Sequence, residues 1–102
     1  MLNSRQRAQL RGMANSYETI FQIGKGGITE SVVDSVNAAL KARELVKGKV
    51  LENSMLTARE ACDMLCEACG AEPVQVIGSK FALFNRNPQN PKIELVKASK
   101  KK

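Results

Sequence analysis

The sequence contains no histidine and no tryptophan, and only one tyrosine and three phenylalanines among its 102 residues. Histidine is the commonest general base and a frequent metal ligand, so its absence removes the usual basis for acid–base or metal-dependent catalysis. No serine stands in a nucleophile-elbow context, and no pair of carboxylates is placed at element ends around a pocket. We therefore expect a protein that is not an enzyme and binds no cofactor. The shortage of rings also argues against nucleic-acid recognition mainly by base stacking.

Long hydrophobic runs are absent as well. No window reaches the length of a membrane-spanning helix, and residues 1–5 lack the apolar core of a signal peptide. Three cysteines, an odd number in a chain without export signals, indicate a reducing compartment. We therefore expect a cytoplasmic protein with no membrane partner. A chain of this length can form one domain without metal or disulfide bonds.

Basic residues are plentiful. Lysine and arginine outnumber aspartate and glutamate by 16 to 10, which gives a net charge of +6. This balance favours nucleic acid, acidic lipid or other acidic partners without choosing among them. Because the third expected helix carries most of the local acid, we expect a basic side and an acidic side. The candidate contacts with such a partner among the basic residues outside the glycine-rich turn are Arg7, Arg11, Lys47, Lys49 and Arg86.

The apolar periodicity predicts seven elements in the order α-β-α-β-α-β-β. The first four are a helix that Ser4 caps and that ends near Asn15, a strand over 19–23, a helix from Thr29 to about Arg43, and a strand over 45–52. In the second strand Val46, Gly48 and Val50 point one way, while Lys47 and Lys49 point the other.

Turn and cap residues define the remaining elements. Thr57 and Glu60 form a capping box for a third helix that ends at Cys69, with Gly70 as its stop. Strands over 74–77 and 81–84 form a hairpin around a turn at 78–80. The order predicts an α/β two-layer sandwich. We expect one domain over residues 1–96, in which Ile93 and Leu95 add a short edge strand, and a basic disordered tail over 97–102.

A glycine-rich turn stands between the first strand and the second helix. It reads Gly24-Lys25-Gly26-Gly27, and Thr29 follows as a helix N-cap. Such a turn joins bare backbone N–H groups to the positive end of a helix dipole, which suits a phosphate. The spacing fits neither a dinucleotide fingerprint nor a nucleoside-triphosphate loop. It fits a G-x-x-G turn of the kind that clamps a nucleic-acid backbone, or a plain tight turn without a ligand.

Three cysteines offer a competing interpretation. Cys62, Cys66 and Cys69 have the C-x3-C-x2-C spacing that holds an iron–sulfur cluster in some radical enzymes. All three fall on the third helix, where Cys62 and Cys69 share the apolar face and Cys66 lies at its edge. Free cysteine behaves as a small buried hydrophobe, so we expect these residues to pack in the core.

Several segments together resemble the CRM domain (chloroplast RNA splicing and ribosome maturation), and in particular the stand-alone bacterial YhbY-type proteins. The likeness runs through residues 1 to 96 in uninterrupted order, and the segments that carry it are Ser4–Gly12, Gln22–Glu30, Arg43–Lys47, Gly70–Glu72 and Val74–Gly78. Two positions depart from the pattern. Gly48 stands where a β-branched residue is common, and residues 84–88 replace the Tyr-Arg-Pro that many relatives have after the last strand.

The resemblance implies a four-stranded mixed sheet with helices packed on it, similar to the C-terminal domain of translation initiation factor three. It also implies RNA binding through Gly24–Gly27 and the adjacent basic surface, with Lys47 as a contributor, and association with precursor large ribosomal subunits. We expect the amides of Gly26, Gly27 and the following turn, up to Thr29, to hold phosphates, and the chain to be a monomer. The alternative is a protein-interaction module that docks on a ribosomal protein or assembly factor.

Overall fold

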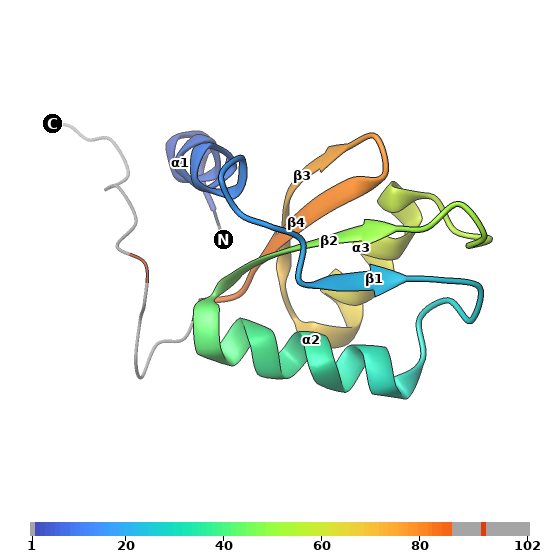
Figure 1. Ribbon diagram of the computed structural model, residues 1–102. Helices are drawn as coiled ribbons and strands as arrows, with labels where there is room; N and C mark the ends of the chain where they lie inside the picture. The colour runs from blue at the N-terminus through green and yellow to red at the C-terminus, as the bar shows by residue number, and fades with distance from the viewer. Residues whose placement is uncertain (1, 87–92, 94–102) are drawn as a thin grey trace, which may run out of the picture.

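A computed structural model describes residues 2–86 and residue 93 (Figure 1). Its seven elements follow the predicted order and are α1 (Ser4–Ala14), β1 (Phe21–Ile23), α2 (Glu30–Arg43), β2 (Leu45–Val50), α3 (Ala58–Cys69), β3 (Glu72–Ile77) and β4 (Lys80–Phe84). The predicted edge strand is not formed at Ile93, which lies in a bend. Leu95 and the predicted tail over 97–102 lie outside the described residues.

The four strands form one mixed sheet in the order β1-β2-β4-β3. β1 runs parallel to β2, whereas β4 is antiparallel to both of its neighbours. The carboxyl ends of β1 and β2 therefore lie at the same end of the sheet, and the hairpin turn between β3 and β4 lies at that end too (Figure 1). The predicted α/β class, the order of the elements and the four-stranded mixed sheet are confirmed.

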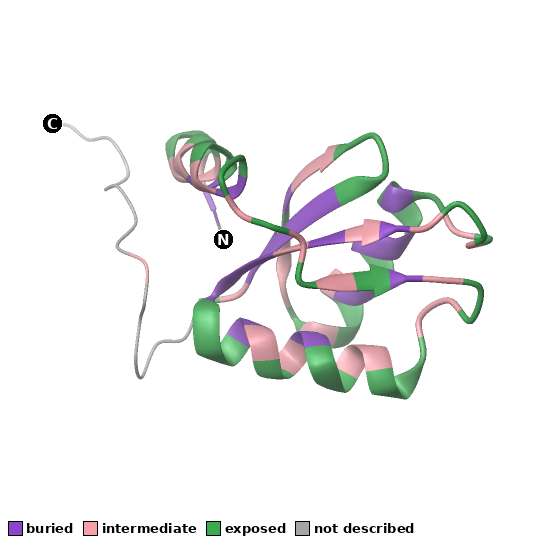
Figure 2. Cartoon of the chain, viewed as in Figure 1, coloured by how far each residue is buried: buried purple, intermediate pink, exposed green. Residues whose placement is uncertain are grey.

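Helices cover both faces of the sheet. α2 and α3 pack on one face around Val46, Phe81 and Leu83. α1 packs on the other face over a smaller core that includes Leu45 and Phe84. β4 lies between these helices, and its residues from Phe81 to Phe84 are all buried, as the purple ribbon of this strand in Figure 2 shows. The arrangement thus has one layer more than the predicted two-layer sandwich, because Leu10 and Ala14 bury the apolar edge of α1 against the sheet.

The helix boundaries follow from capping residues. Thr29 caps α2 and Thr57 caps α3, each by accepting a backbone N–H in the first turn, as predicted. The cap of α1 is Asn3, not Ser4 as we predicted. Asn3 forms a capping box with Gln6, and a side-chain carbonyl at this position accepts the Gln6 N–H at 2.8 Å.

Glu44 ends α2 and has two further functions. It is the one residue other than glycine with a positive φ in the described part of the chain, at 66°, and its side chain is fully buried. Its backbone carbonyl accepts the N–H of Asn85 at 2.9 Å, and its carboxylate accepts the N–H of Ile93 at 2.7 Å. One residue therefore connects the end of α2, the end of β4 and the segment that follows.

Candidate nucleic-acid interface

The G-x-x-G loop is a tight turn at the carboxyl end of β1. The N–H of Gly27 donates to the carbonyl of Gly24 at 3.1 Å, which places Lys25 and Gly26 at the two central positions. Gly27 has φ 71°, a conformation that favours glycine. Lys25 and Gly26 are exposed. The turn therefore projects outward and is not covered by another described segment.

Of the three glycines of the loop, only Gly27 is required by its own backbone conformation, because only Gly27 has a positive φ. A Cβ atom on Gly24 would come no closer than 3.7 Å to Leu51, and one on Gly26 would meet only a methyl group of Thr29 at 4.0 Å. Neither position has a positive φ. Side chains would therefore fit at both positions, so the bare backbone there leaves room for something outside the protein.

The hydrogen bonds of the turn correct one expectation. We predicted that the amide of Gly27 is bare, but it is used within the turn. Across residues 2–86 the amides of Lys25 and Gly26 meet no acceptor, so these two are available to an anion. The hydroxyl of Thr29 is likewise occupied, since it accepts the Val32 N–H at 3.2 Å. The amides of Ile28 and Thr29 likewise meet no acceptor from residues 2–86, as predicted, although Glu30 adds an exposed carboxylate to the first turn of α2.

A second basic feature lies beside the loop. Lys49 of β2 and Lys80 of β4 are directly opposite each other in the antiparallel register. Like charges at such positions repel each other and destabilise a sheet. The hairpin turn lies close to the end of β2, because the Ser79 carbonyl accepts the Val50 N–H at 2.8 Å. Lys80 was not among the predicted RNA contacts, although pairing of the hairpin with β2 would have indicated it.

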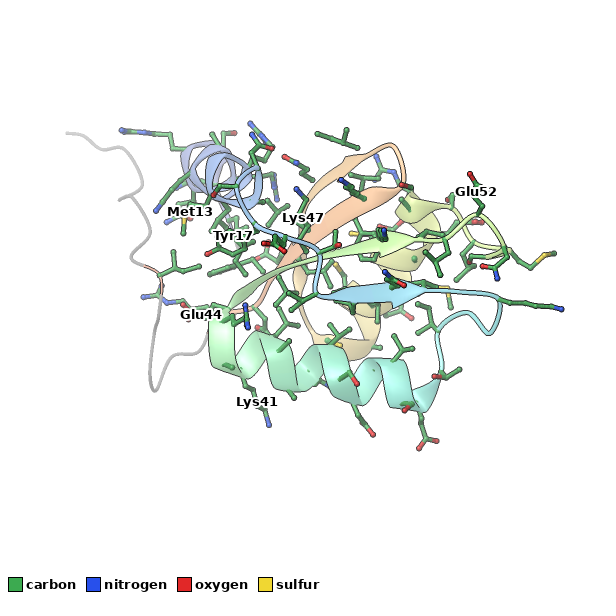
Figure 3. All side chains as sticks on the ribbon, viewed as in Figure 1. Met13, Tyr17, Lys41, Glu44, Lys47 and Glu52 are labelled. Atoms are coloured by element: carbon green, nitrogen blue, oxygen red, sulfur yellow. The ribbon has the colours of Figure 1, made fainter. Side chains whose placement is uncertain are left out.

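Lys47 differs from Lys49 in its surroundings. Its Nζ donates to the carbonyl of Ala14 in the last turn of α1, at 3.1 Å, and the side chain is half-buried. Figure 3 shows it directed toward the C-terminal end of α1. A cation at this place satisfies a terminal carbonyl and suits the negative end of the helix dipole. Lys47 therefore has a structural function in addition to any contact with a ligand.

The predicted arginines are dispersed. Arg7 and Arg11 lie one turn apart on α1, on the same side of the sheet as Lys47. Arg86 follows β4, whose last residue pairs with the first residue of β2, so it lies at the end of the sheet opposite the G-x-x-G loop. The structure thus brings Lys49 and the loop to one end but does not bring Arg86 to them.

The charge asymmetry that we predicted is present. The exposed acids of α3 lie on the far side of the sheet from α1 and its arginines, and they are Glu60, Asp63 and Glu67. The lysines of β2 and β4 lie on the α1 side, because they alternate with residues that point to α2 and α3. The sheet therefore separates a basic face from an acidic one.

The cysteines of α3 pack in the core. Cys62 is fully buried, and Cys69 directs its thiol to the carbonyl of Val33 at 4.0 Å. A hydrogen bond with Cys62 and burial raise the pKa of the Cys66 thiol, and burial raises the pKa of Cys69. In the described part of the chain no group of three cysteine or acidic side chains is arranged to hold a metal ion.

The sequence of the chain is similar to those of known proteins. The CRS1 / YhbY (CRM) domain matches residues 2–85. The chain belongs to the CRM-domain family. Among relatives of this CRM-domain protein, the Bacillus subtilis protein named "Probable RNA-binding protein YqeI" is 35% identical over 93% of this chain and 99% of its own. A Haemophilus influenzae protein named "RNA-binding protein" is 30% identical over 92% of this chain and 94% of its own.

A solved structure gives the same result for the fold. The solution structure of the hypothetical protein SAV1595 from Staphylococcus aureus is 41% identical and superimposes with a TM-score of 0.78. The match covers 94% of this CRM-domain protein and all of the other chain. Membership in a family of RNA-binding proteins agrees with the expectation that the chain is not an enzyme. Within residues 2–86 no helix has the length and apolar character needed to cross a bilayer.

Proposed function

We propose that this CRM-domain protein binds the sugar-phosphate backbone of RNA with its G-x-x-G loop and the lysines beside it. The observation that carries the proposal is the outward turn, in which the amides of Lys25 and Gly26 meet no acceptor from residues 2–86. Lys25 adds a cation at the tip, and the opposed pair Lys49 and Lys80 adds two more at the same end of the sheet.

The physical basis is neutralisation of phosphate charge. An RNA phosphate between Lys49 and Lys80 removes the repulsion that the folded protein otherwise retains. Backbone amides add directional hydrogen bonds to the phosphate oxygens, which position the strand without reading its sequence. Since rings are few, we expect recognition of backbone shape and low intrinsic sequence specificity.

We further propose that the RNA is ribosomal RNA of a precursor large subunit. The support is the resemblance to the stand-alone bacterial members, which extends through the loop and its flanking segments. Crosslinking in cells followed by sequencing of the attached RNA tests this directly. Recovery of large-subunit ribosomal RNA is expected, and recovery of unrelated RNA alone would overturn this part while leaving RNA binding intact.

A specific observation favours a second candidate, the docking of α3 on a basic protein. Met64 is 45% exposed on the outer side of α3, among the acids Glu60, Asp63 and Glu67. A Met flanked by carboxylates suits a basic, partly apolar surface such as that of a ribosomal protein. Binding to protein-stripped ribosomal RNA, compared with binding to RNA-free ribosomal proteins, separates the two candidates.

A further inference from the structure

A cavity opens beside the first half of β2, beneath the connection between α1 and β1. Its volume is about 390 Å³, near the small end of the range for ligand sites, which suits one nucleotide better than a larger molecule. It exists because β1 has three residues and pairs only with Gly48–Val50. The outer edge of β2 over residues 45–47 therefore has no strand beside it.

The connection over this cavity is held at both of its ends. The Tyr17 N–H donates to the Ala14 carbonyl at 3.0 Å, and the Ile20 N–H donates to the Lys47 carbonyl at 2.8 Å. Because backbone groups alternate in direction along a strand, those of Leu45 face the same edge as the Lys47 carbonyl. Leu45 itself is fully buried, so the groups that an occupant can reach are mainly those of the connection and the side chains of Arg43 and Lys47.

The lining combines one aromatic ring with two cations. Tyr17 is the single tyrosine of the chain and is half-buried beside Met13. Arg43, in the last turn of α2, lines the cavity and is exposed to solvent. Tyr17 and Lys47 lie close together beneath α1 in Figure 3, and both line the cavity.

The chemistry of these groups selects the ligand. An ammonium group has three donors, so the bond from Lys47 to the Ala14 carbonyl leaves two for another acceptor. Tyrosine rings stack on nucleobases, and a guanidinium binds phosphate. Glu18, at the rim, is an acceptor for a base that carries an amino group. The paired cations favour an anionic aromatic ligand over an apolar side chain of a partner protein.

From this arrangement we infer that the cavity binds one unpaired nucleotide of RNA, with its base against the Tyr17 ring and its phosphate at Arg43 and Lys47. The inference rests on the proposed RNA binding and adds a second contact to it. The G-x-x-G loop lies beyond the other end of β2. A strand rises about 3.3 Å per residue, so that end of β2 is roughly 16 Å from Leu45. The two contacts would therefore engage different nucleotides of one strand.

The test is a titration of the ¹⁵N-labelled protein with adenosine monophosphate, followed by NMR. Shifts at Gly24–Gly27, whose amides would bind the phosphate alone, should not depend on the base, and we expect the amides of residues 17–20 and 45–47 to shift as well. Ribose 5-phosphate, which has no base, is the matched ligand and should shift these latter amides much less. Equal shifts of the latter amides with both ligands, or no shifts of them at millimolar concentration, would overturn the inference.

Variants assign the effect to the named side chains. Tyr17→Leu should weaken binding of adenosine monophosphate about tenfold, whereas Tyr17→Phe, which keeps the ring, should retain it. Since Tyr17 also packs against the core, Arg43→Gln gives an independent test at an exposed position. Its control is Lys41→Gln, the same charge change on the outward side of α2 in Figure 3. Retained affinity in both Tyr17→Leu and Arg43→Gln would contradict the inference.

The two proposals fail in different ways. The double variant Lys25→Asp with Gly26→Asp should lose binding to long RNA but keep the shifts that adenosine monophosphate causes at residues 17–20 and 45–47. Wild-type protein that binds long RNA without nucleotide shifts would overturn the cavity site alone. Wild-type protein that shows nucleotide shifts but does not bind long RNA would overturn the proposed function alone.

Discussion

The ring of Phe21 lies against the backbone of Gly48, its partner in the parallel register between β1 and β2. A Cβ atom placed on Gly48 would come within 2.4 Å of two atoms of that ring. Phe21 in turn meets Phe81 edge to face, with ring centroids 5.6 Å apart and an interplanar angle of 71°. Glycine at position 48 therefore makes room for the Phe21 ring, and any side chain there would have to displace that ring.

The first prediction concerns this contact. Gly48→Val should lower the free energy of unfolding by about 1–3 kcal/mol, because the new side chain must displace the Phe21 ring within a packed core. Gly12→Ala is the control, since nothing lies within 4 Å of that position on α1. It should raise stability by about 0.5–1 kcal/mol. Urea denaturation measures both, and a neutral Gly48→Val would show that the ring moves freely.

The second prediction concerns the G-x-x-G loop. Lys25→Asp combined with Gly26→Asp should weaken RNA binding at least about tenfold, since it replaces a cation and an open backbone with two carboxylates. The melting temperature should hardly change, because both positions are exposed and Gly26 has open space around it. Lys41→Asp makes the same lysine-to-aspartate change away from the loop, and this control should bind RNA nearly as well as the wild type. Parallel losses of binding and melting temperature would mean that the loop is only structural.

A third prediction follows from the salt dependence of phosphate contacts. If the loop and the neighbouring lysines engage about three to five phosphates of RNA, the logarithm of the association constant should fall against the logarithm of salt concentration with a slope of about −2 to −4. Fluorescence anisotropy with a labelled RNA across a salt series measures this slope. An affinity that does not respond to salt would exclude the mechanism.

The lysines of β2 and β4 give a fourth prediction. Lys49→Gln or Lys80→Gln should make the salt slope about one unit shallower while leaving stability unchanged or slightly higher, because each removes the like-charge pair. Lys47→Gln should instead lower stability by about 1 kcal/mol through loss of its bond to Ala14. Thermal unfolding and RNA titration of the same three variants separate the effects. Equal destabilisation by all three would refute this division of functions.

The thiols of α3 give a fifth prediction. Because their pKa values are raised, Cys66 and Cys69 should carry little thiolate at pH 7.5 and react with iodoacetamide more slowly than free cysteine. The rate should increase as the pH rises above the ordinary range for a thiol. Mass spectrometry of timed samples measures it, and labelling as fast as that of the free amino acid would contradict the assignment of these residues to packing.

Much of the fold could be predicted because local chemistry and tertiary packing agree. The capping residues Thr29 and Thr57 mark two helix starts, and the alternation over residues 46–50 predicts that Lys47 and Lys49 are the less buried residues of β2. The cap of α1 was misplaced by one residue, since asparagine and serine stand side by side and both are good caps. The apolar periodicity of the helix does not distinguish Asn3 from Ser4 as its cap.

The remaining features depend on contacts between distant segments. The bond from Lys47 to Ala14 joins residues 33 positions apart, and no local pattern distinguishes Lys47 from Lys49. The contact of Phe21 with Gly48 and the opposition of Lys49 and Lys80 require the register of the sheet. The cavity beside Tyr17 depends on β1 being shorter than β2, and a predicted strand over 19–23 would have filled that edge.

The buried carboxylate of Glu44 has a consequence for how much chain the fold needs. Its Oε1 atom accepts a hydrogen bond from the N–H of Ile93, eight residues beyond the last residue matched to the family. A shortened form that stops at Arg86 would keep all four strands, but the buried carboxylate of Glu44 would lose the Ile93 N–H as a hydrogen-bond donor. The melting temperature of this form should be lower than that of the full chain, so we expect full stability to require residues that follow the last strand.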